Sequence, residues 1–318
     1  MGSIPSFPPL KTLFNFIFVV FKNFMNKLYS YSSCLNYFSE LLRDKFYLNY
    51  YSEDQLDIFQ KNIILICSTS SEEFWLNFNL ENINSNRYFD ICDKIKKHFL
   101  EKQPVSYLTK KCFFNGNSFE IQPGVFIPQH DTEILISKAL ELISEIWTCD
   151  DKLDILEIGT GSGNISISLA KNNNLWRIKS LDINENALSV ARNNARNLNV
   201  DSIVFFKSDV FSNVRGKFDV IISNPPYIGI EEYNHLDPYT KAQPKEALVA
   251  ENNGYWFYQE IAEKSRFFLK DKFLLIFEIG YKQQDEIIKI VLTCFSDIKV
   301  KNFYDNNCQS RVVAFYRF

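Results

Sequence analysis

A glycine-rich segment is the first stretch whose residue types predict ligand binding: Glu157-Ile-Gly-Thr-Gly-Ser-Gly163. Glycine permits positive φ and lets a ligand approach the backbone closely, so this spacing predicts a binding turn between a strand and a helix. The pattern is neither the G-x-G-x-x-G of a dinucleotide site nor a P-loop, because no Gly-Lys-Ser/Thr follows. We therefore expect a ligand that needs no pyrophosphate grip.

An acidic residue, Asp182, follows the next apolar segment, 19 residues after Gly163. A carboxylate in that position can accept two hydrogen bonds from a ribose diol. Together the glycines and Asp182 suit a nucleoside without phosphates, and S-adenosylmethionine fits, with its ribose at Asp182 and its amino-acid end over the glycine loop. An ordinary strand–helix turn is the alternative, and the placement of Asp182 argues against it.

A second motif, Asn224-Pro-Pro-Tyr227, comes directly after another apolar segment. The two prolines stiffen the backbone and lack N–H groups, so the local backbone presents carbonyl acceptors. Those acceptors, the Asn224 side-chain oxygen and the flat Tyr227 ring together predict a receptor for a planar NH₂ group. A delocalised amide or aryl amine nitrogen is a poor nucleophile, so alignment must supply much of the catalysis, about 7–11 kcal/mol in good cases. Hydrogen bonds to both hydrogens also disperse positive charge as it develops. A simple proline turn is the alternative.

The elements that position these motifs alternate between helix and strand from residue 131 onward. The pattern predicts helices at 131–146, 164–171, 186–197, 255–269 and 283–294, and strands at 153–158, 178–183, 202–206, 218–223, 273–279, 298–304 and 311–316. This alternation predicts an α/β fold with a mostly parallel seven-stranded sheet covered by helices on both faces. The last two strands have no helix between them, which predicts one antiparallel edge strand.

The chain before residue 131 has a different character. Apolar spacing predicts helices through most of 12–100. Val105–Thr109 and Ser118–Gln122 flank the turn-like Asn115-Gly116-Asn117, which predicts a β-hairpin. We divide the chain into an extension at 1–30, a small helical domain at 31–103, a hairpin linker at 104–128 and an α/β domain at 129–318. The extension lacks acidic residues, which leaves a targeting segment or an extra helix, and its apolar run is too short to span a bilayer.

The composition excludes several classes of protein. The 318 residues are 46% hydrophobic and 23% charged, which excludes a wholly disordered chain, and the net charge of −3 does not favour stable nucleic-acid binding. Seven cysteines without C-x-x-C spacing and three histidines predict free thiols in a reducing, cytoplasmic compartment and no metal site.

Residues 101–318 resemble the HemK/PrmC family, the protein-(glutamine-N5) methyltransferases of peptide-chain release factors. The resemblance lies in the two motifs and in Gln103–Thr109, Phe126–Glu133, Ser208–Phe211 and Pro244–Ala250. It implies a class I S-adenosylmethionine-dependent methyltransferase fold, Rossmann-like, that methylates the side-chain amide nitrogen of a release-factor glutamine. It also implies that 129–318 is catalytic and that 31–103 helps to recognise the substrate. We further expect a monomer without a membrane span.

The resemblance carries over to individual positions. For the cofactor it implies Glu157, Gly159, Thr160, Gly161, Ser162, Gly163, Asp182, Ile183, Asp209, Val210 and Asn224. For the glutamine amide it implies Asn224, Pro225, Pro226 and Tyr227, of which Asn224, Pro225 and Tyr227 are expected to act in catalysis. Gln129 and His130 replace the family's Arg-Pro, and Val210 stands where many relatives carry Trp, which is expected to weaken binding without changing the reaction.

Two other functions remain open from the sequence. The Asn-Pro-Pro-Tyr motif also occurs in enzymes that methylate adenine N6 in DNA or guanine N2 in ribosomal RNA. The segment 228–253, however, carries more acidic than basic residues, which disfavours a phosphate-binding surface. A retained fold without activity is the second alternative, and the intact motifs argue against it. The roles of four residues are undecided from the sequence. Glu278 could face the site, cap a helix or belong to an edge strand, and Glu133 could serve only to start a helix, where an acid favours the dipole. His235 and Tyr239 could contact a partner or be solvated loop residues.

Overall fold

The computed structural model describes residues 62, 66, 90–91, 93–94, 97–98 and 101–318. The chain divides into two compact units, Met1–Thr109 and Lys110–Phe318, and this boundary falls within the segment 104–128 predicted as a linker. The extension at 1–30 and most of the predicted helical domain at 31–103 lie outside the described residues. Among the described residues, no helix is long and apolar enough to cross a membrane.

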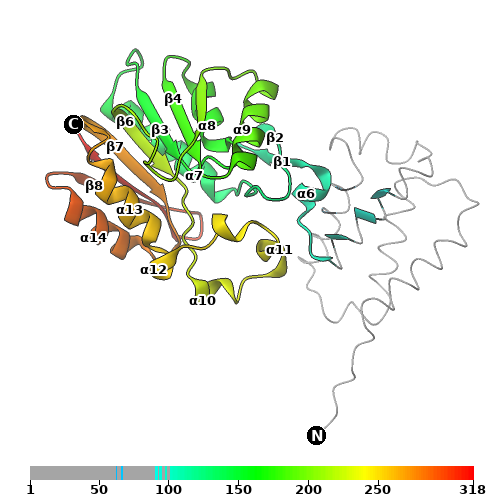
Figure 1. Ribbon diagram of the computed structural model, residues 1–318. Coiled ribbons are helices and arrows are strands. Elements are labelled where there is room, and N and C mark those ends of the chain that lie inside the picture. The colour runs from blue at the N-terminus through cyan, green and yellow to red at the C-terminus, as the bar shows by residue number, and fades with distance from the viewer. Residues whose placement is uncertain (1–61, 63–65, 67–89, 92, 95–96, 99–100) are drawn as a thin grey trace, which may run out of the picture. The chain divides into compact units, whose positions relative to one another are not determined.

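The second unit is built on a seven-stranded sheet with the strand order β5-β4-β3-β6-β7-β9-β8 (Figure 1). The strands are β3 (Asp154–Ile158), β4 (Arg177–Asp182), β5 (Ile203–Lys207), β6 (Phe218–Ser223), β7 (Leu269–Glu278), β8 (Lys299–Tyr304) and β9 (Ser310–Arg317). Strands β3 to β7 pair in parallel, and β9 runs antiparallel to both β7 and β8 at the C-terminal edge. This arrangement confirms the predicted fold class, with β9 inserted between β7 and the edge strand β8.

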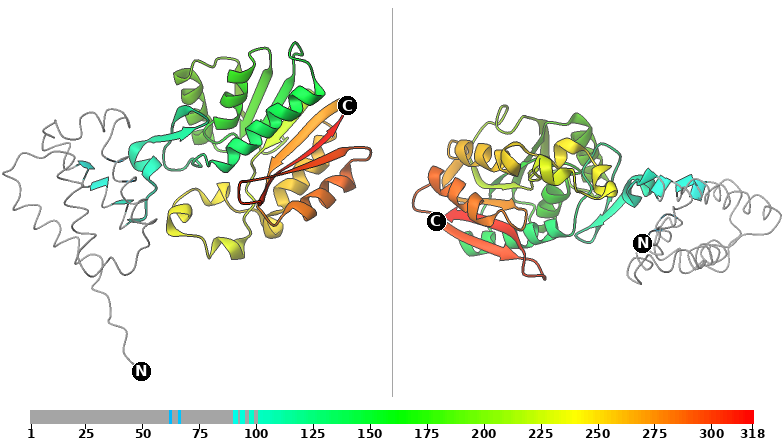
Figure 2. Two further views of the ribbon diagram at one scale, coloured as in Figure 1. Left: turned by 180° about the vertical axis from the view of Figure 1, so that it is seen from behind. Right: turned by 90° about the horizontal axis from the view of Figure 1, so that it is seen from below.

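Helices cover both faces of the sheet (Figures 1 and 2). Alternate residues of each strand enter two separate cores, as the period-2 geometry of strands requires. On one face, Ile155, Ile222 and Ile276 pack with α7 (Asp131–Ile146) and α8 (Asn164–Asn172). On the other face, Leu156, Ile221 and Leu275 pack with α13 (Trp256–Ser265) and α14 (Gln284–Cys294). The sheet is therefore buried on both sides, which explains its nearly continuous apolar strands.

Two element predictions were wrong at their ends. The predicted helix 255–269 ends at Ser265, and β7 begins at Leu269 instead of Phe273. Leu269 pairs with Phe218 of β6, and the ammonium of Lys270 reaches Asp154 Oδ2 and Asp219 Oδ2, each at 2.7 Å. These pairings with distant residues extend the strand beyond what local propensity indicates.

The hairpin was predicted correctly in type but not in extent. It consists of β1 (Lys111–Phe114) and β2 (Asn117–Glu120), joined by Asn115 and Gly116, which both have positive φ, as a tight hairpin turn requires. Val105–Thr109, expected as a flanking strand, is instead the short helix α6. Pro104 precedes it, and its carbonyl accepts hydrogen bonds from the N–H groups of Tyr107 and Leu108, so the proline starts a helical turn despite the β-branched residues that follow.

The segment between β6 and α13 forms a loop of short helices: α10 (Ile230–Tyr233), α11 (Pro238–Lys241), the 3₁₀ turn η1 (Lys245–Ala247) and α12 (Glu251–Gly254). Its base is closed by Ile228, whose N–H donates to the Leu248 carbonyl at 2.9 Å and whose carbonyl accepts from Ala250 N–H at 3.0 Å. The loop therefore returns to the end of β6, next to the Asn-Pro-Pro-Tyr motif.

A buried amide ties three parts of this unit together. Asn194 lies on α9 (Glu185–Asn197), and its Oδ1 accepts from Glu120 N–H of β2 at 2.6 Å. Its Nδ2 donates to the carbonyls of Glu120 and Ser162, each at 3.0 Å. Asn194 thus satisfies polar backbone groups of both the hairpin and the glycine-rich loop, away from water.

We expect Asn194→Ala to lower the free energy of unfolding by about 2–3 kcal/mol, because it leaves these backbone groups buried without partners. Urea unfolding followed by circular dichroism measures this change. Asn193→Ala is the matched control, since Asn193 is exposed on the same helix, and it should change stability by less than about 0.5 kcal/mol. Equal effects of the two variants would contradict the assigned role.

Candidate active site

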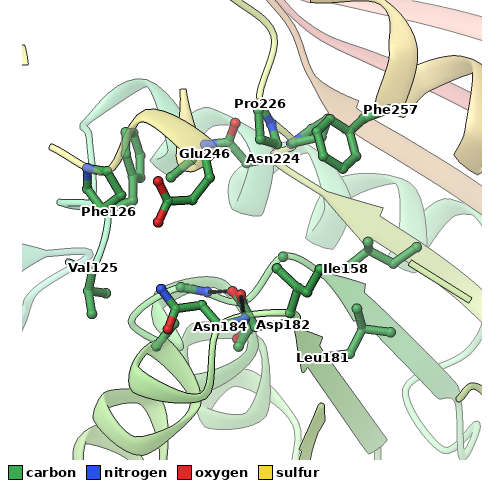
Figure 3. Close-up of a pocket in the computed structure, with 18 of the residues that line it drawn as sticks. Val125, Phe126, Ile158, Leu181, Asp182, Asn184, Asn224, Pro226, Glu246 and Phe257 are labelled. Carbon is green, nitrogen blue, oxygen red and sulfur yellow. Dashed lines mark hydrogen bonds between the residues drawn. The ribbon is translucent and has the colours of Figure 1, made fainter. Parts of the chain in front are cut away.

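One cavity lies at the carboxyl ends of the parallel strands, where open α/β sheets bind ligands. Strands β3 and β6 are neighbours with Ile158 opposite Ser223, and the Ser223 hydroxyl donates to the Ile158 carbonyl at 2.8 Å. The segments that follow these two strands therefore start side by side. The cavity is lined by residues of both segments, namely Gly159, Thr160, Gly161, Ser162, Asn224, Pro225, Pro226 and Tyr227. Figure 3 shows part of this lining.

The glycine-rich loop follows the end of β3, and the N–H groups of Gly159 and Thr160 both donate to the Leu181 carbonyl of β4 at 2.9 Å. Gly159, Gly161 and Gly163 all have positive φ, and a Cβ on either of the first two would meet no atom within 4 Å. Gly163 has a different task. A Cβ there would lie 3.1 Å from the Ala191 Cβ, so this glycine allows α8 and α9 to pack closely. Gly163 does not line the cavity, whereas Gly159 and Gly161 do.

Asp182 ends β4 and faces the same cavity (Figure 3). Its Oδ2 accepts from Gly161 N–H and its Oδ1 from Asn184 N–H, both at 2.9 Å. Burial raises the pKa of Asp182 above its usual value, while these backbone hydrogen bonds act in the opposite direction. Each carboxylate oxygen has a further lone pair for a ligand hydroxyl. Ile183, which follows, also lines the cavity and is largely exposed.

Glu157 lies behind the loop and does not line the cavity. It is fully buried, Thr160 Oγ1 donates to its Oε2 at 2.7 Å, and its Oε1 has no hydrogen-bond partner among the described residues. Burial raises the pKa of this carboxyl from 4.5 to about 7. Glu157 therefore acts on the shape of the loop through Thr160.

Asp209 and Val210 close a third side of the cavity after β5. Val210 has a φ of 43°, which is rare for a β-branched residue and costs about 1–3 kcal/mol. The Ser208 hydroxyl stabilises this conformation by donating to the Val210 carbonyl at 3.0 Å and accepting from Asn213 N–H at 3.0 Å. The apolar Val210 side chain is buried at the edge of the cavity.

The Asn-Pro-Pro-Tyr segment is held from behind. The Tyr227 carbonyl accepts from Gln283 Nε2 at 2.9 Å, and Gln283 Oε1 accepts from Gly280 N–H at 3.0 Å. Gly254 has a φ of 90°, and a Cβ there would lie 2.0 Å from the Tyr227 carbonyl oxygen, so only glycine permits this approach. Burial raises the pKa of the Tyr227 phenol, which keeps it neutral at physiological pH.

Several lining residues had no role assigned from the sequence: Val125, Phe126, Thr132, Leu181, Asn184, Pro244, Glu246 and Phe257. Figure 3 shows Phe126 and Glu246 on the side of the cavity opposite Asp182. Phe126, Thr132 and Pro244 belong to segments that carried the family resemblance. That resemblance was the available signal, because no spacing rule brings residues 126, 132 and 244 together.

The structure gives a position to each residue whose role the sequence left undecided, and none of them lines the cavity. Glu133 Oε1 accepts from Asn115 N–H at 2.7 Å and so supports the hairpin turn. Gln129 Nε2 donates to the Ile127 carbonyl at 2.8 Å, and His235 Nδ1 lies 2.9 Å from the Glu231 carbonyl. None of these residues lines the cavity, nor do His130 and Tyr239. Glu278 ends β7 and is only 3% exposed, behind Asn224.

The residues present fit S-adenosylmethionine. Two glycines leave open space beside the backbone, Asp182 offers a carboxylate, and Leu181, Ile183 and Val210 form apolar walls for an adenine. Among the described residues, no group of three or more His, Cys, Asp or Glu is placed to hold a metal ion.

Comparisons with known proteins agree with this geometry. The family model "Methyltransferase small domain" matches residues 118–236. The release factor glutamine methyltransferase of Bacillus subtilis is 32% identical over 257 residues, covering 79% of this chain and 88% of that protein. The enzyme of the same name from Bacillus cereus is 35% identical over 237 residues, covering 73% and 83%.

Among solved structures, the hMettl16 catalytic domain in complex with the MAT2A 3'UTR hairpin 6 has a TM-score of 0.51 at 15% identity, covering 74% of this chain and 82% of that one. At that identity the likeness shows a shared fold only. The sequence relatives reach further, because their identity of 32–35% extends across most of both chains. The chain belongs to the release factor glutamine methyltransferase family.

Proposed function

We propose that this protein transfers a methyl group from S-adenosylmethionine to the side-chain amide nitrogen (N5) of a glutamine in a peptide-chain release factor. One observation carries the proposal: a single cavity is lined by the glycine-rich loop and Asp182 on one side and by Asn224–Tyr227 on the other. A donor site and an NH₂ receptor therefore share one cavity. Family membership supports the identity of the acceptor.

The donor is held by groups that match its parts. Asp182 accepts the ribose hydroxyls, the backbone of Gly159–Ser162 meets the amino-acid end, and Asp209, Val210 and Ile183 flank the adenine. Glu157 and Gly163 act indirectly, by shaping the loop and by allowing α8 and α9 to pack. When bound, S-adenosylmethionine supplies an electrophilic methyl group on a sulfonium sulfur.

The acceptor amide is held by the motif on the other side. Asn224 Oδ1 and the Pro225 carbonyl accept its two hydrogens, while the Tyr227 ring and Pro226 cover its plane. The amide nitrogen forms the new bond to carbon while the sulfur–carbon bond breaks, and the nitrogen then loses one proton to water. No strong base is needed before attack, because the hydrogen bonds disperse the positive charge that develops on nitrogen.

Methylation of an exocyclic amine in DNA or ribosomal RNA is the alternative that the motif allows. The loop between β6 and α13 exposes Glu231, Glu232, Glu246 and Glu251, a poor surface for phosphates. The curated relatives carry names of protein methyltransferases, which favours the protein substrate. We include in the proposal a monomer without stably bound nucleic acid, in a reducing, cytoplasmic compartment. Among the described residues, the thiols of Cys149, Cys294 and Cys308 are free, which is consistent with that compartment.

Purified protein incubated with labelled S-adenosylmethionine should label a release factor and should leave duplex DNA and ribosomal RNA unlabelled. Replacing the acceptor glutamine should abolish the label. Asn224→Ala should lower kcat by about 100-fold, because an oriented hydrogen-bond acceptor at the reacting group is lost. Label on nucleic acid alone would refute the proposal and support the alternative.

Asp182→Asn should weaken the binding of S-adenosylmethionine by at least about tenfold, because hydrogen bonds to a charged group are worth about 1.5–3 kcal/mol. Isothermal titration calorimetry without any acceptor measures this directly. Asp201→Asn is the control, since Asp201 is exposed and outside the cavity. If both variants bound the donor as tightly as the original protein, the ribose assignment would be wrong.

A further inference from the structure

A buried polar cluster adjoins Asn224. Its members are Thr132, the second residue of α7, and Glu278, the last residue of β7. Thr132 is 1% exposed and Glu278 is 3% exposed. The Asn224 Nδ2 donates to Thr132 Oγ1 at 3.1 Å. The Asn224 amide is therefore held from outside the motif by Thr132, which lies 92 positions earlier in the chain. Glu278 lies 54 positions later in the chain.

The direction of that hydrogen bond matters for an NH₂ receptor. A side-chain amide has an acceptor oxygen and a donor nitrogen on opposite sides of its carbon. With Nδ2 directed back to Thr132, Oδ1 is left to face the cavity that Asn224 lines. The flipped amide would present an NH₂ group to the substrate NH₂ group, and two donors cannot bond to each other.

Thr132 alone cannot determine which way the amide points. A hydroxyl can donate or accept, so it would tolerate either orientation of Asn224. An ionised carboxylate can only accept. An ionised Glu278 can accept the Thr132 hydroxyl hydrogen, which leaves the lone pairs of Thr132 Oγ1 for Asn224 Nδ2. Thr132 and Asn224 each lower the pKa of Glu278 and so favour its ionised form, while Glu278 Oε2 has no hydrogen-bond partner among the described residues.

We propose that Glu278 and Thr132 are positioning residues that hold the Asn224 amide with Oδ1 toward the substrate. This inference rests on the proposed function for its consequence in catalysis, but the orientation itself is a property of the protein without ligand. Glu278 does not line the cavity and acts through Thr132 and Asn224.

The charge of Glu278 controls the arrangement. Burial raises its pKa from 4.5 to about 7, Thr132 lowers it, Asp131 of α7 raises it and Arg311 of β9 lowers it. Arg311 forms its ion pairs with Asp131 at 3.2 Å and Asp305 at 2.9 Å. Tyr227 and the buried Tyr258 also face Glu278, and the raised pKa of each phenol keeps it neutral. Because the ionised form fixes Asn224, the productive orientation is lost as pH falls through about 7.

The direct test is nuclear magnetic resonance of the full chain with ¹⁵N-labelled asparagine, the Asn224 signal being assigned with Asn224→Ala. The side-chain NH₂ signal of Asn224 should titrate with a midpoint near pH 7, and Glu278→Gln should abolish that titration. Asn194, whose amide is bonded to the hairpin and the glycine-rich loop, provides an internal reference that should not titrate. This measurement needs neither donor nor acceptor, so it stands even if the proposed function fails.

The kinetic test compares, at each of the two positions, a variant that removes the proposed interaction with a variant that keeps its chemical group. Thr132→Val and Glu278→Gln should each lower kcat at saturating donor by about tenfold or more, while Thr132→Ser and Glu278→Asp should recover part of the loss. The original protein should gain kcat as pH rises through about 7, and Glu278→Gln should lose that dependence. Thermal unfolding of each variant shows whether a lower kcat comes from a destabilised fold or from a changed orientation of the Asn224 amide.

Three results would overturn the inference: an Asn224 signal that does not titrate near pH 7, a pH profile unchanged in Glu278→Gln, or full kcat in Thr132→Val. If the original protein transfers no methyl group, the proposed function fails, whereas the resonance measurement still decides the orientation.

Discussion

The parallel pairing of β3 with β6 is the constraint on which the site depends. Ile158 lies opposite Ser223, and the Ser223 hydroxyl binds the Ile158 carbonyl, so the glycine-rich loop and the Asn-Pro-Pro-Tyr segment leave the sheet at the same level. Neighbouring strands are about 4.8 Å apart. Two motifs separated by some 60 residues of chain therefore border one cavity. The chain reaches this arrangement by running outward from β3 to β5 and then crossing back to β6, which makes a topological switch point.

Two buried carboxyls stand behind the two halves of the cavity. Glu157 supports the glycine-rich loop through Thr160, and Glu278 lies behind Asn224. Burial raises the pKa of each from 4.5 to about 7. A group whose folded pKa is raised in this way lowers stability progressively as pH rises from its unfolded pKa to about 7. Both residues therefore reduce stability at neutral pH, a cost that is understandable where they orient the groups that contact ligands.

The proposed reaction makes few demands on acid–base chemistry and strict demands on orientation. The described residues supply it with rigid acceptors: a proline-rich backbone, an asparagine fixed from behind and a tyrosine whose carbonyl is bonded to Gln283. Gly254 permits close packing against that carbonyl, which stiffens the motif further. Rigid placement of acceptors is the means by which a protein can make a weakly nucleophilic amide react.

The sequence alone determined the fold class, the positions of most strands and helices, and the two motifs that border the cavity. These features depend on local patterns: apolar periodicity, glycine spacing and proline pairs. It failed at Val105–Thr109 and at the start of β7, where Pro104 and the pairing of Leu269 with Phe218 outweighed propensity. Only the tertiary structure showed that Gly163 serves helix packing, that Asn194 joins the hairpin to the glycine-rich loop, and that Thr132 and Glu278 lie behind Asn224. Those relations are contacts between residues far apart in the chain, and no local pattern encodes them, because they exist only once the sheet has brought the strand ends together.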